Sequence, residues 1–175
     1  MFFLTGTDEH GKKIQQASQK AGKSPKEFVD GQVMGFEDLC AKWDISYDRF
    51  IRTTEPGHEK VCQGLFERVL KKGDIYLGKY DGLYCTACEA FYLEKDLEGG
   101  LCPVHRCPVE RVSEESYFFK MSKYQKQLLE FYKKNPDFIS PARRRQELVN
   151  RVKDGLKDLS VSRTSFNWGI QLKND

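Results

Sequence analysis

Four cysteines and a histidine gather in one short stretch of the chain. Two closely spaced pairs stand thirteen residues apart, in the pattern C-x2-C-x13-C-x2-H, formed by Cys85, Cys88, Cys102 and His105. Each pair brackets a tight turn in which two ligands face one point, and Zn²⁺ prefers a tetrahedral set of cysteine sulfur and histidine nitrogen. Four protein ligands leave no open position for a catalytic water. The spacing therefore predicts a structural zinc site.

Two alternatives concern this same cluster. Cys107 lies two residues beyond His105 and is a second candidate for the fourth ligand, although the equal spacing of the two pairs favours His105. Free or disulfide-paired thiols are the other interpretation. Because the sequence begins without a recognisable secretory signal, we expect a reducing compartment, either the cytoplasm or an organellar matrix. Metal binding explains the cysteines better there, and the metal would hold together a small β subdomain with little core.

The composition is typical of a folded globular protein, with 39% hydrophobic and 31% charged residues. No apolar run approaches the roughly 18 residues of a membrane span, so we expect no membrane partner. The net charge is only +3, which gives no global argument for nucleic-acid binding. One basic cluster can meet phosphate or form an ordinary solvated helix face; it comprises Arg143, Arg144, Arg145, Arg151 and Lys153.

The first part of the chain alternates strand and helix patterns. Strands are expected at residues 2–4 and 50–54, and a helix that begins at the capping turn 6–8 is expected to end at Gly22. A second helix begins at Ser24-Pro25 and carries apolar residues at three- and four-residue steps up to Trp43, and a third ends at Gly73. This order predicts an α/β fold with helices packed on a mostly parallel sheet.

After Gly73 the pattern changes to short aromatic-rich strands around the cysteines, expected at residues 75–80, 82–84, 108–112 and 117–120. Two helices are expected at 122–134 and 142–153, and an extended stretch at 158–170. We therefore divide the chain into 1–73, 74–157 and 158–175. Because it opens within a strand pattern, we expect it to be part of a longer protein.

Six sequence blocks stand in a defined order along the chain. They are GTDEHG (6–11), FIRTT (50–54), GDIYLG (73–78), EESYFF (114–119), DLSVSR (158–163) and WGI (168–170). Each block alone is a weak signal, but all six in register, with a zinc module between them, are highly specific. In this respect the chain resembles the methionyl-tRNA synthetase family along essentially its whole length.

The resemblance implies a fold and an activity. Residues 1–73 would be part of a class I Rossmann nucleotide-binding domain, interrupted at 74–157 by a connective insertion with zinc knuckles, and 158–175 would return to the catalytic domain. The insertion would lie near the acceptor end of tRNA(Met). The parent enzyme would join methionine to ATP with the help of Mg²⁺ and then pass the methionyl group to tRNA, mainly through positioning and charge stabilisation.

The resemblance also implies two site residues. In the family pattern the aspartate of the Gly-x-Asp-x-His-Gly block and the arginine before Trp-Gly lie near the catalytic site and support adenylate formation. These positions fall on Asp8 and Arg163. A helix N-cap is the alternative role for Asp8, and an ordinary ion pair is the alternative for Arg163.

The chain departs from the family pattern in several places. The His-Ile-Gly-His and Lys-Met-Ser-Lys-Ser motifs of ATP binding are expected upstream and downstream of the sequence given, so we expect these residues alone to be inactive. The KMSKY segment at 120–124 resembles the second motif, but it lies in the insertion and leads into a helix. Gln171 stands where the family usually has proline.

Two other interpretations remain open from the sequence. One is a fragment of another class I synthetase, of the isoleucyl or valyl type, although those enzymes have longer insertions with an editing domain. The other is a stand-alone zinc module that binds nucleic acid, which the basic cluster at residues 143–153 would favour and the α/β first third would not explain.

Overall fold

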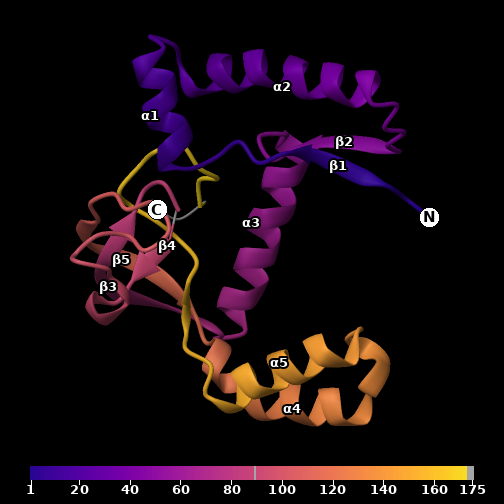
Figure 1. Cartoon of the computed structure of the whole chain (residues 1–175), viewed down its shortest axis with the longest axis vertical. Coiled ribbons are helices and arrows are strands. Elements are labelled where there is room, and N and C mark those ends of the chain that lie inside the picture. Colours follow the sequence, from indigo (N-terminus) through magenta and orange to yellow (C-terminus); the bar gives the residue numbers. More distant parts are fainter. Residues whose placement is uncertain (89, 173–175) are drawn as a thin grey trace. The chain divides into compact units, whose positions relative to one another are not determined.

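The structure is a computed structural model that describes residues 1–88 and 90–172 (Figure 1). Its elements include a two-stranded sheet, β1-β2, and a four-stranded sheet in the order β4-β3-β5-β6. The chain forms two compact units. The first comprises Met1–Arg68, Asp81–Glu114 and Thr164–Asp175, and the second comprises Val69–Tyr80 and Glu115–Arg163. Among the described residues, no helix has the length and apolar character needed to cross a membrane.

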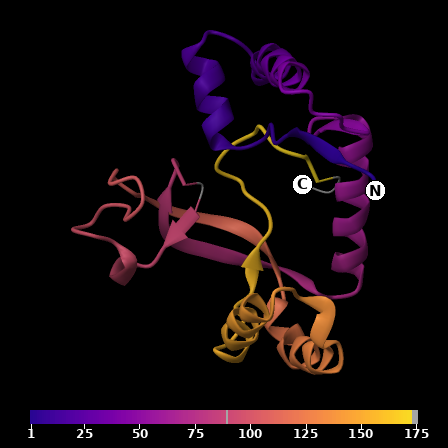
Figure 2. The ribbon, with the colours of Figure 1, turned by 45° about the vertical axis from the view of Figure 1, so that its right-hand side comes forward.

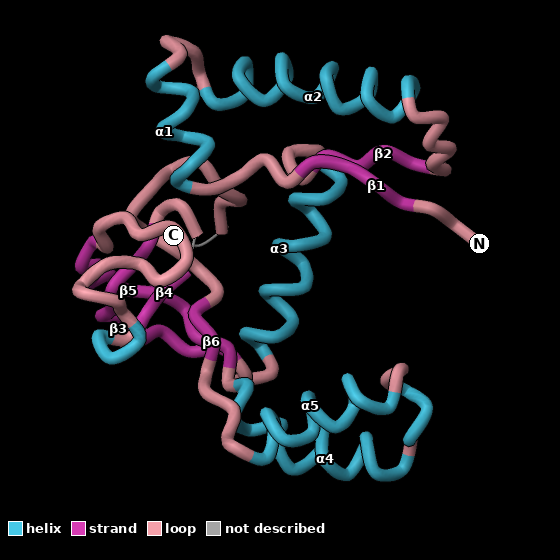
Figure 3. Tube along the Cα trace, viewed as in Figure 1, coloured by secondary structure: helices cyan, strands magenta, loops and turns pink. Residues whose placement is uncertain are grey.

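The first unit contains a parallel strand pair. β1 (Leu4–Thr7) runs beside β2 (Arg49–Arg52), with Leu4 opposite Arg49 and Thr7 opposite Arg52. Two helices, α1 (Lys12–Lys20) and α2 (Pro25–Lys42), connect the strands (Figures 1 and 3). Parallel strands require such a long crossover because a tight hairpin reverses direction. The expected α/β order of this part is confirmed.

The start of α2 follows its sequence signal. The Ser24 side chain accepts a hydrogen bond from the backbone N–H of Glu27, and the Glu27 carboxylate accepts one from the backbone N–H of Ser24 at 3.0 Å. This capping box satisfies two backbone donors that the first helical turn leaves unpaired, and Pro25 adds a preset φ angle at the first helical position. Of the apolar stripe along α2, Val29 and Val33 are buried, whereas Phe36 and Trp43 are exposed.

The start of α1 differs from the prediction. The helix begins at Lys12 with Gly11 as its N-cap, and no side chain caps it. Gly6 and Thr7 continue β1 instead, because they pair with Ile51 and Arg52 of β2. Gly11, with a φ of 110°, turns the chain into the helix. The interpretation of Asp8 as a helix N-cap is therefore wrong.

The third helix, α3 (Pro56–Lys71), ends as expected at Gly73. Gly73 has a φ of 76°, and its N–H donates to the carbonyl of Leu70, while the N–H of Asp74 donates to the carbonyl of Val69. This double hydrogen bond is the Schellman arrangement, which uses glycine because the left-handed conformation disfavours a Cβ atom. β3 (Ile75–Cys85) begins two residues later.

The strands after Gly73 are longer than predicted. β3 is one strand where two were expected, and β5 (Glu110–Phe119) also joins two expected strands. Charged and polar residues at the expected breaks are accommodated by partners. Asp81 in β3 accepts two hydrogen bonds from the Arg111 guanidinium, at 3.2 and 3.3 Å. The buried hydroxyl of Ser116 in β5 contacts the Ser160 hydroxyl at 2.6 Å. Polar composition alone therefore misplaced the strand ends.

The remaining elements complete the two units. β4 (Ala90–Tyr92) pairs with β3, and β6 (Leu159–Ser160) pairs with β5, both antiparallel. In the second unit α4 (Gln125–Lys134) and α5 (Ala142–Lys153) form a helical hairpin whose Val152 side chain is buried (Figure 2). Three short 3₁₀ helices lie at Glu94–Asp96, Met121–Tyr124 and Pro136–Phe138. Both expected helices of this region are present.

The close approach of β1 and β2 at Gly6 generates a prediction. A Cβ atom on Gly6 would meet the carbonyl oxygen of Ile51 at 1.8 Å, whereas a Cβ on Gly64 of α3 would meet nothing within 4 Å. We expect Gly6→Ala to lower the free energy of unfolding by about 1–3 kcal/mol through overpacking. The matched Gly64→Ala should raise it by about 0.5–1 kcal/mol, because alanine favours helix. Thermal unfolding followed by circular dichroism measures both, and equal midpoints for the two variants would contradict the close strand approach.

Candidate functional site

The predicted cysteine and histidine ligands lie together. The ligand atoms of Cys85, Cys88, Cys102 and His105 all fall within 4.8 Å of one another, in an arrangement that can hold a metal ion. Cys85 and Cys102 are fully buried, while His105 is exposed. Two thiols from the first pair and a thiol and an imidazole from the second pair therefore face one point, as the spacing predicted.

The first pair of ligands lies on a β-hairpin. Cys85 ends β3 and pairs with Ala90 of β4, so the turn between the strands carries Cys88. The Tyr92 hydroxyl, also on β4, donates a hydrogen bond to the Cys88 sulfur at 3.2 Å. The hairpin therefore brings both cysteines to one end of the strand pair, and Tyr92 holds the Cys88 thiol there.

The second pair of ligands, Cys102 and His105, lies on a tight loop. A turn formed by two glycines precedes this loop and directs it toward the first pair. Gly99 and Gly100 both have positive φ angles, and Glu98 and Leu101 exchange two backbone hydrogen bonds across them. This is a two-residue hairpin turn of the kind that requires glycine. The turn brings Cys102 back toward the first hairpin.

Local hydrogen bonds prepare Cys102 for metal binding. Burial raises the pKa of the Cys102 thiol, but backbone N–H groups of His105 and Val104 outweigh it and lower the pKa to about 6. The His105 N–H lies 3.5 Å from the Cys102 sulfur. A thiolate at neutral pH is the form that ligates metal, because the thiol itself is a poor ligand. The second knuckle therefore holds an anionic ligand ready.

Cys107, the other candidate ligand, lies beside the cluster. Its sulfur is 3.6 Å from that of Cys85, and its backbone carbonyl accepts a hydrogen bond from the Cys102 N–H. The His105 Nδ1 atom lies 2.9 Å from the Cys88 sulfur and belongs to the mutually close set. The geometry thus groups His105, rather than Cys107, with the three cysteines.

A second candidate site lies in the first unit, at the carboxyl ends of β1 and β2. Ligands of open α/β sheets bind at this edge, because the loops that leave the strands there are free to face them. Residues 8–10 form the loop after β1, and Asp8 is exposed on it. Within the described residues the Asp8 carboxylate makes no hydrogen bond or ion pair, so it is available to a ligand.

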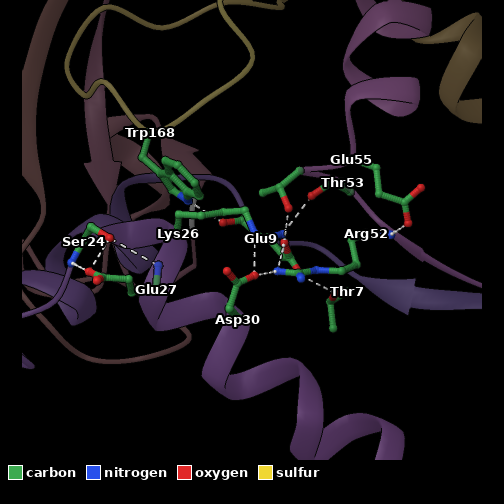
Figure 4. A network of polar contacts seen from close by, with 11 residues as sticks. Thr7, Glu9, Ser24, Lys26, Glu27, Asp30, Arg52, Thr53, Glu55 and Trp168 are labelled. Atoms are coloured by element: carbon green, nitrogen blue, oxygen red, sulfur yellow. Dashed lines mark hydrogen bonds and ion pairs between the residues drawn. The ribbon is translucent and has the colours of Figure 1, made fainter.

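Glu9, next to Asp8, is only 2% exposed and is the centre of a polar network (Figure 4). The Arg52 guanidinium donates two hydrogen bonds to its carboxylate, from Nε at 2.7 Å and from a terminal nitrogen at 3.0 Å. Hydroxyls of Thr7 and Thr54 donate to the same carboxylate. The ends of both parallel strands are thus joined through one side chain.

The network extends to α2 and to the last residues of the chain. A terminal nitrogen of Arg52 also lies 2.6 Å from an Asp30 oxygen of α2. The indole N–H of Trp168 donates to the backbone carbonyl of Glu9 at 2.6 Å. His10 packs against Trp168 with ring centroids 5.4 Å apart, and burial lowers its pKa despite the nearby Glu59. His10 is accordingly neutral at pH 7.

Arg163, the other site residue implied by the resemblance, is the last residue of the second unit and is partly buried. The N–H of Val161, two residues earlier, donates to the carbonyl of Tyr117 in β5. This hydrogen bond and the β5-β6 pairing anchor the backbone that leads to Arg163. Asp8 belongs to the first unit, so the structure describes these two residues separately.

Comparison with known proteins identifies the family. A sequence model of the tRNA synthetases class I (M) matches residues 1–114 and 107–175. The chain belongs to this family. It is 53% identical to a methionine–tRNA ligase of Caldanaerobacter subterraneus subsp. tengcongensis, and 51% identical to one of Halalkalibacterium halodurans. All of this chain is covered, but only 27% and 28% of those relatives. It therefore spans about a quarter of their length.

Solved structures agree with the family assignment. Mycobacterium tuberculosis methionyl-tRNA synthetase in complex with methionyl-adenylate matches 99% of this chain at 42% identity, with a TM-score of 0.90, over 35% of that protein. The expected α/β fold of a class I synthetase with a cysteine-rich insertion is confirmed. The isoleucyl or valyl type and the stand-alone zinc module are not favoured, because the similarity to methionine–tRNA ligases covers the whole chain.

The segment at residues 120–124, which resembles the synthetase Lys-Met-Ser-Lys-Ser loop, makes hydrogen bonds within the second unit. The Lys123 ammonium and the Tyr124 hydroxyl both bond to the carboxylate of Asp74, which is fully buried. The Ser122 hydroxyl donates to Asp158 at 2.6 Å, and the Lys120 ammonium donates to the Gly73 carbonyl at 2.9 Å. These polar groups thus hold the segment in place within the second unit.

Sequence reasoning missed the Glu9 and Arg52 pair. The two residues lie 43 positions apart. Glu9 stands in the GTDEHG block and Arg52 in the FIRTT block, but neither block indicates the contact between them. A usable signal existed, because each charged residue ends or follows one of two strands separated by helices. Charged side chains at adjacent carboxyl ends of parallel strands are placed side by side.

The Asp74 contacts generate a prediction about stability and pH. Hydrogen bonds from Lys123 and Tyr124 hold the pKa of Asp74 well below its usual range, against the effect of burial, with a further contribution from Lys72. The resulting stabilisation is present above the ordinary carboxyl pKa of about 4 and is lost as the pH falls further below it. We expect Lys123→Met to lower the thermal midpoint at pH 7, and the difference from wild type to narrow at pH 3.

Lys126→Met, at an exposed position of α4, is the matched control and should change the midpoint little at either pH. Circular dichroism melts at both pH values measure these shifts. A Lys123→Met midpoint equal to that of the control at pH 7 would show that the Asp74 ion pair does not stabilise the second unit.

Proposed function

We propose that this chain forms part of a methionine–tRNA ligase, which activates methionine with ATP and transfers it to tRNA(Met). The observation that carries the proposal is the match of 99% of the chain, at 42% identity and a TM-score of 0.90, to a synthetase in complex with methionyl-adenylate. The 53% identity to a methionine–tRNA ligase over the whole chain supports the same activity.

In this proposal Asp8 supplies negative charge at the carboxyl end of β1. The residue is exposed and makes no hydrogen bond or ion pair within the part of the chain that the structure describes. Its carboxylate would bind a cationic group of the substrate, such as the α-ammonium of methionine, and so hold the amino acid for attack on ATP. Such fixed charges lower a reaction barrier because they need no reorganisation during the reaction.

Arg163 would supply positive charge to the same reaction. A guanidinium forms strong charged hydrogen bonds with phosphate oxygens, on which negative charge develops when the methionine carboxylate attacks the α-phosphate and pyrophosphate leaves. ATP would enter with Mg²⁺, which neutralises charge on the phosphates when bound. Adenylate formation would thus depend on charges from two segments of this chain, together with the ATP-binding motifs of the family.

We also propose that the metal is Zn²⁺ and that its role is structural. The donor set of three cysteines and one histidine suits zinc, and the Cys102 pKa of about 6 favours the thiolate ligand. With four protein ligands, zinc would have no position for water and would perform no chemistry. It would join the β3-β4 hairpin to the Cys102 loop in a region whose most buried residues are two of the ligands, Cys85 and Cys102. The insertion that it stabilises would lie near the acceptor end of tRNA.

The activity can be tested in a chimeric ligase, in which residues 1–175 replace the matching segment of the Caldanaerobacter enzyme. We expect methionine-dependent pyrophosphate exchange in the chimera. Asp8→Asn, Asp8→Ala and Arg163→Ala should each lower the exchange rate more than tenfold, because each removes a charge from the reacting groups. Since Asp8 does not cap α1, Asp8→Asn tests its charge alone.

Asp38→Asn, at an exposed position of α2, is the matched control and should retain full exchange. A chimera without methionine-dependent exchange would contradict the proposed activity. An active chimera in which Asp8→Asn exchanges at the wild-type rate would instead contradict the role assigned to Asp8.

The metal proposal predicts one zinc per chain by elemental analysis. Cys85→Ser, Cys102→Ser and His105→Ala should each lose the metal, because three ligands hold zinc far more weakly than four. Cys107→Ser should retain it, as should the control Cys40→Ser on α2. Chelation should loosen residues 82–112 before the helices, which hydrogen exchange can follow. If His105→Ala keeps zinc and Cys107→Ser loses it, Cys107 is the fourth ligand instead.

A further inference from the structure

We propose that Glu9 is a positioning residue for adenylate formation and that it acts by holding the loop that carries Asp8. The inference rests on the proposed function and deepens it, because it gives a role to a residue of the GTDEHG block to which the resemblance assigned none. It follows from the number and the origin of the contacts around one buried carboxylate (Figure 4).

Glu9 is held through its side chain and through both of its backbone groups. Its carboxylate accepts hydrogen bonds from Arg52, Thr7 and Thr54. Its backbone N–H donates to the Thr53 hydroxyl at 2.9 Å, and its carbonyl accepts from the Trp168 indole at 2.6 Å. A residue held at every polar group cannot rotate or shift without losing several of these bonds. The peptide between Asp8 and Glu9 is therefore fixed on its Glu9 side.

The loop is fixed at its other end as well. The Gly11 N–H donates to the Trp168 carbonyl at 3.1 Å, and Gly11 turns the chain into α1. Thr7, on the other side of Asp8, is paired with Arg52 in the parallel sheet. Asp8 thus stands between two anchored residues, with its own side chain exposed. Such an arrangement leaves the carboxylate accessible while restricting the backbone that presents it.

Charge is essential to this anchor. Burial opposes ionisation of Glu9, but hydrogen bonds from Arg52, Thr54 and Thr7 outweigh it and lower its pKa. The hydrogen bonds that Arg52 donates to the Glu9 carboxylate raise the pKa of Arg52 above its already high value, and Asp30 adds to the effect. Both partners are therefore charged at neutral pH. An amide at position 9 would keep the shape of the side chain and lose the charge-assisted bonds.

A purely stabilising role would not require this construction. Burial of two charges costs desolvation energy, and apolar residues of similar size often stabilise a core equally well or better. What a fully satisfied network provides is a single geometry, because every alternative leaves a buried charge unpaired. The network lies at the strand ends where Asp8 is presented, so a defined geometry of Asp8 is its direct consequence.

The test uses the chimeric ligase and a double-mutant cycle between positions 8 and 9. Glu9→Gln should lower kcat for pyrophosphate exchange at least tenfold and raise KM for methionine, with KM for ATP nearly unchanged, because a misplaced Asp8 no longer holds the methionine ammonium in place. Addition of Glu9→Gln to Asp8→Ala should lower kcat less than about threefold further. A residue that acts through Asp8 has little left to affect once Asp8 is gone.

Two further variants separate positioning from folding. Thr54→Val removes one donor to Glu9 and should give a milder decrease of kcat with the same dependence on Asp8, even if Glu9→Gln folds poorly. Arg111→Gln is the matched control, because Arg111 also donates two hydrogen bonds to one carboxylate, that of Asp81, at 3.2 and 3.3 Å, but makes no hydrogen bond to Glu9 or Arg52 among the described residues. It should leave kcat unchanged.

The outcomes are distinguishable. An active chimera in which Glu9→Gln and Thr54→Val both keep the wild-type kcat would overturn the positioning role and leave the proposed function intact. The role would also be overturned if the fold decrease of kcat in the double variant equalled the product of the decreases in Glu9→Gln and Asp8→Ala. Glu9 would then act independently of Asp8. A wild-type chimera without methionine-dependent exchange would overturn the proposed function, and the positioning role with it.

Discussion

Two charged hydrogen bonds between Glu9 and Arg52 join the carboxyl ends of β1 and β2, and the geometry of the candidate adenylation site depends on them. The strands themselves are only four residues long and share one ladder. Such a short pair is weakly held by backbone bonds alone. Arg52 of the buried ion pair also contacts Asp30 of α2, and the Glu9 carbonyl accepts a hydrogen bond from Trp168. Segments far apart in the sequence therefore meet at one point.

The cysteine-rich region also has little apolar packing to hold it together. Its buried residues are largely Cys85, Cys102 and Tyr84, which is too little apolar surface to order a loop of this length. A bound metal would replace a core there, because metal binding contributes its free energy directly to folding. In the second unit the buried Asp74 bonds to Lys123 and Tyr124, and so holds the start of β3 against the start of α4. Polar contacts thus define the geometry wherever apolar packing is thin.

Local signals explain how much of this was predictable. The C-x2-C and C-x2-H pairs, the helix start at Ser24-Pro25 and the Gly73 helix end depend on neighbours a few residues away, and each was predicted. The resemblance was specific enough to give the family. The sequence did not indicate that β3 continues through Asp81 and β5 through Ser116, because these polar residues are accommodated by partners on other segments. The Glu9 network was not predicted, for the same reason. A helix N-cap was given as the alternative role of Asp8 because the neighbouring Gly6 and Thr7 suit turns as well as strands.

The central claim is that the loop after β1, held by Glu9, presents Asp8 to the substrate of an aminoacyl-tRNA ligase. The most direct measurement is a crystal structure of the chimeric ligase with a non-hydrolysable methionyl-adenylate analogue. The account predicts the Asp8 carboxylate within about 3.2 Å of the ligand's ammonium group, with the Glu9 and Arg52 bonds intact. An analogue bound in full, with Asp8 turned away from it and more than about 6 Å from every ligand atom, would contradict the account.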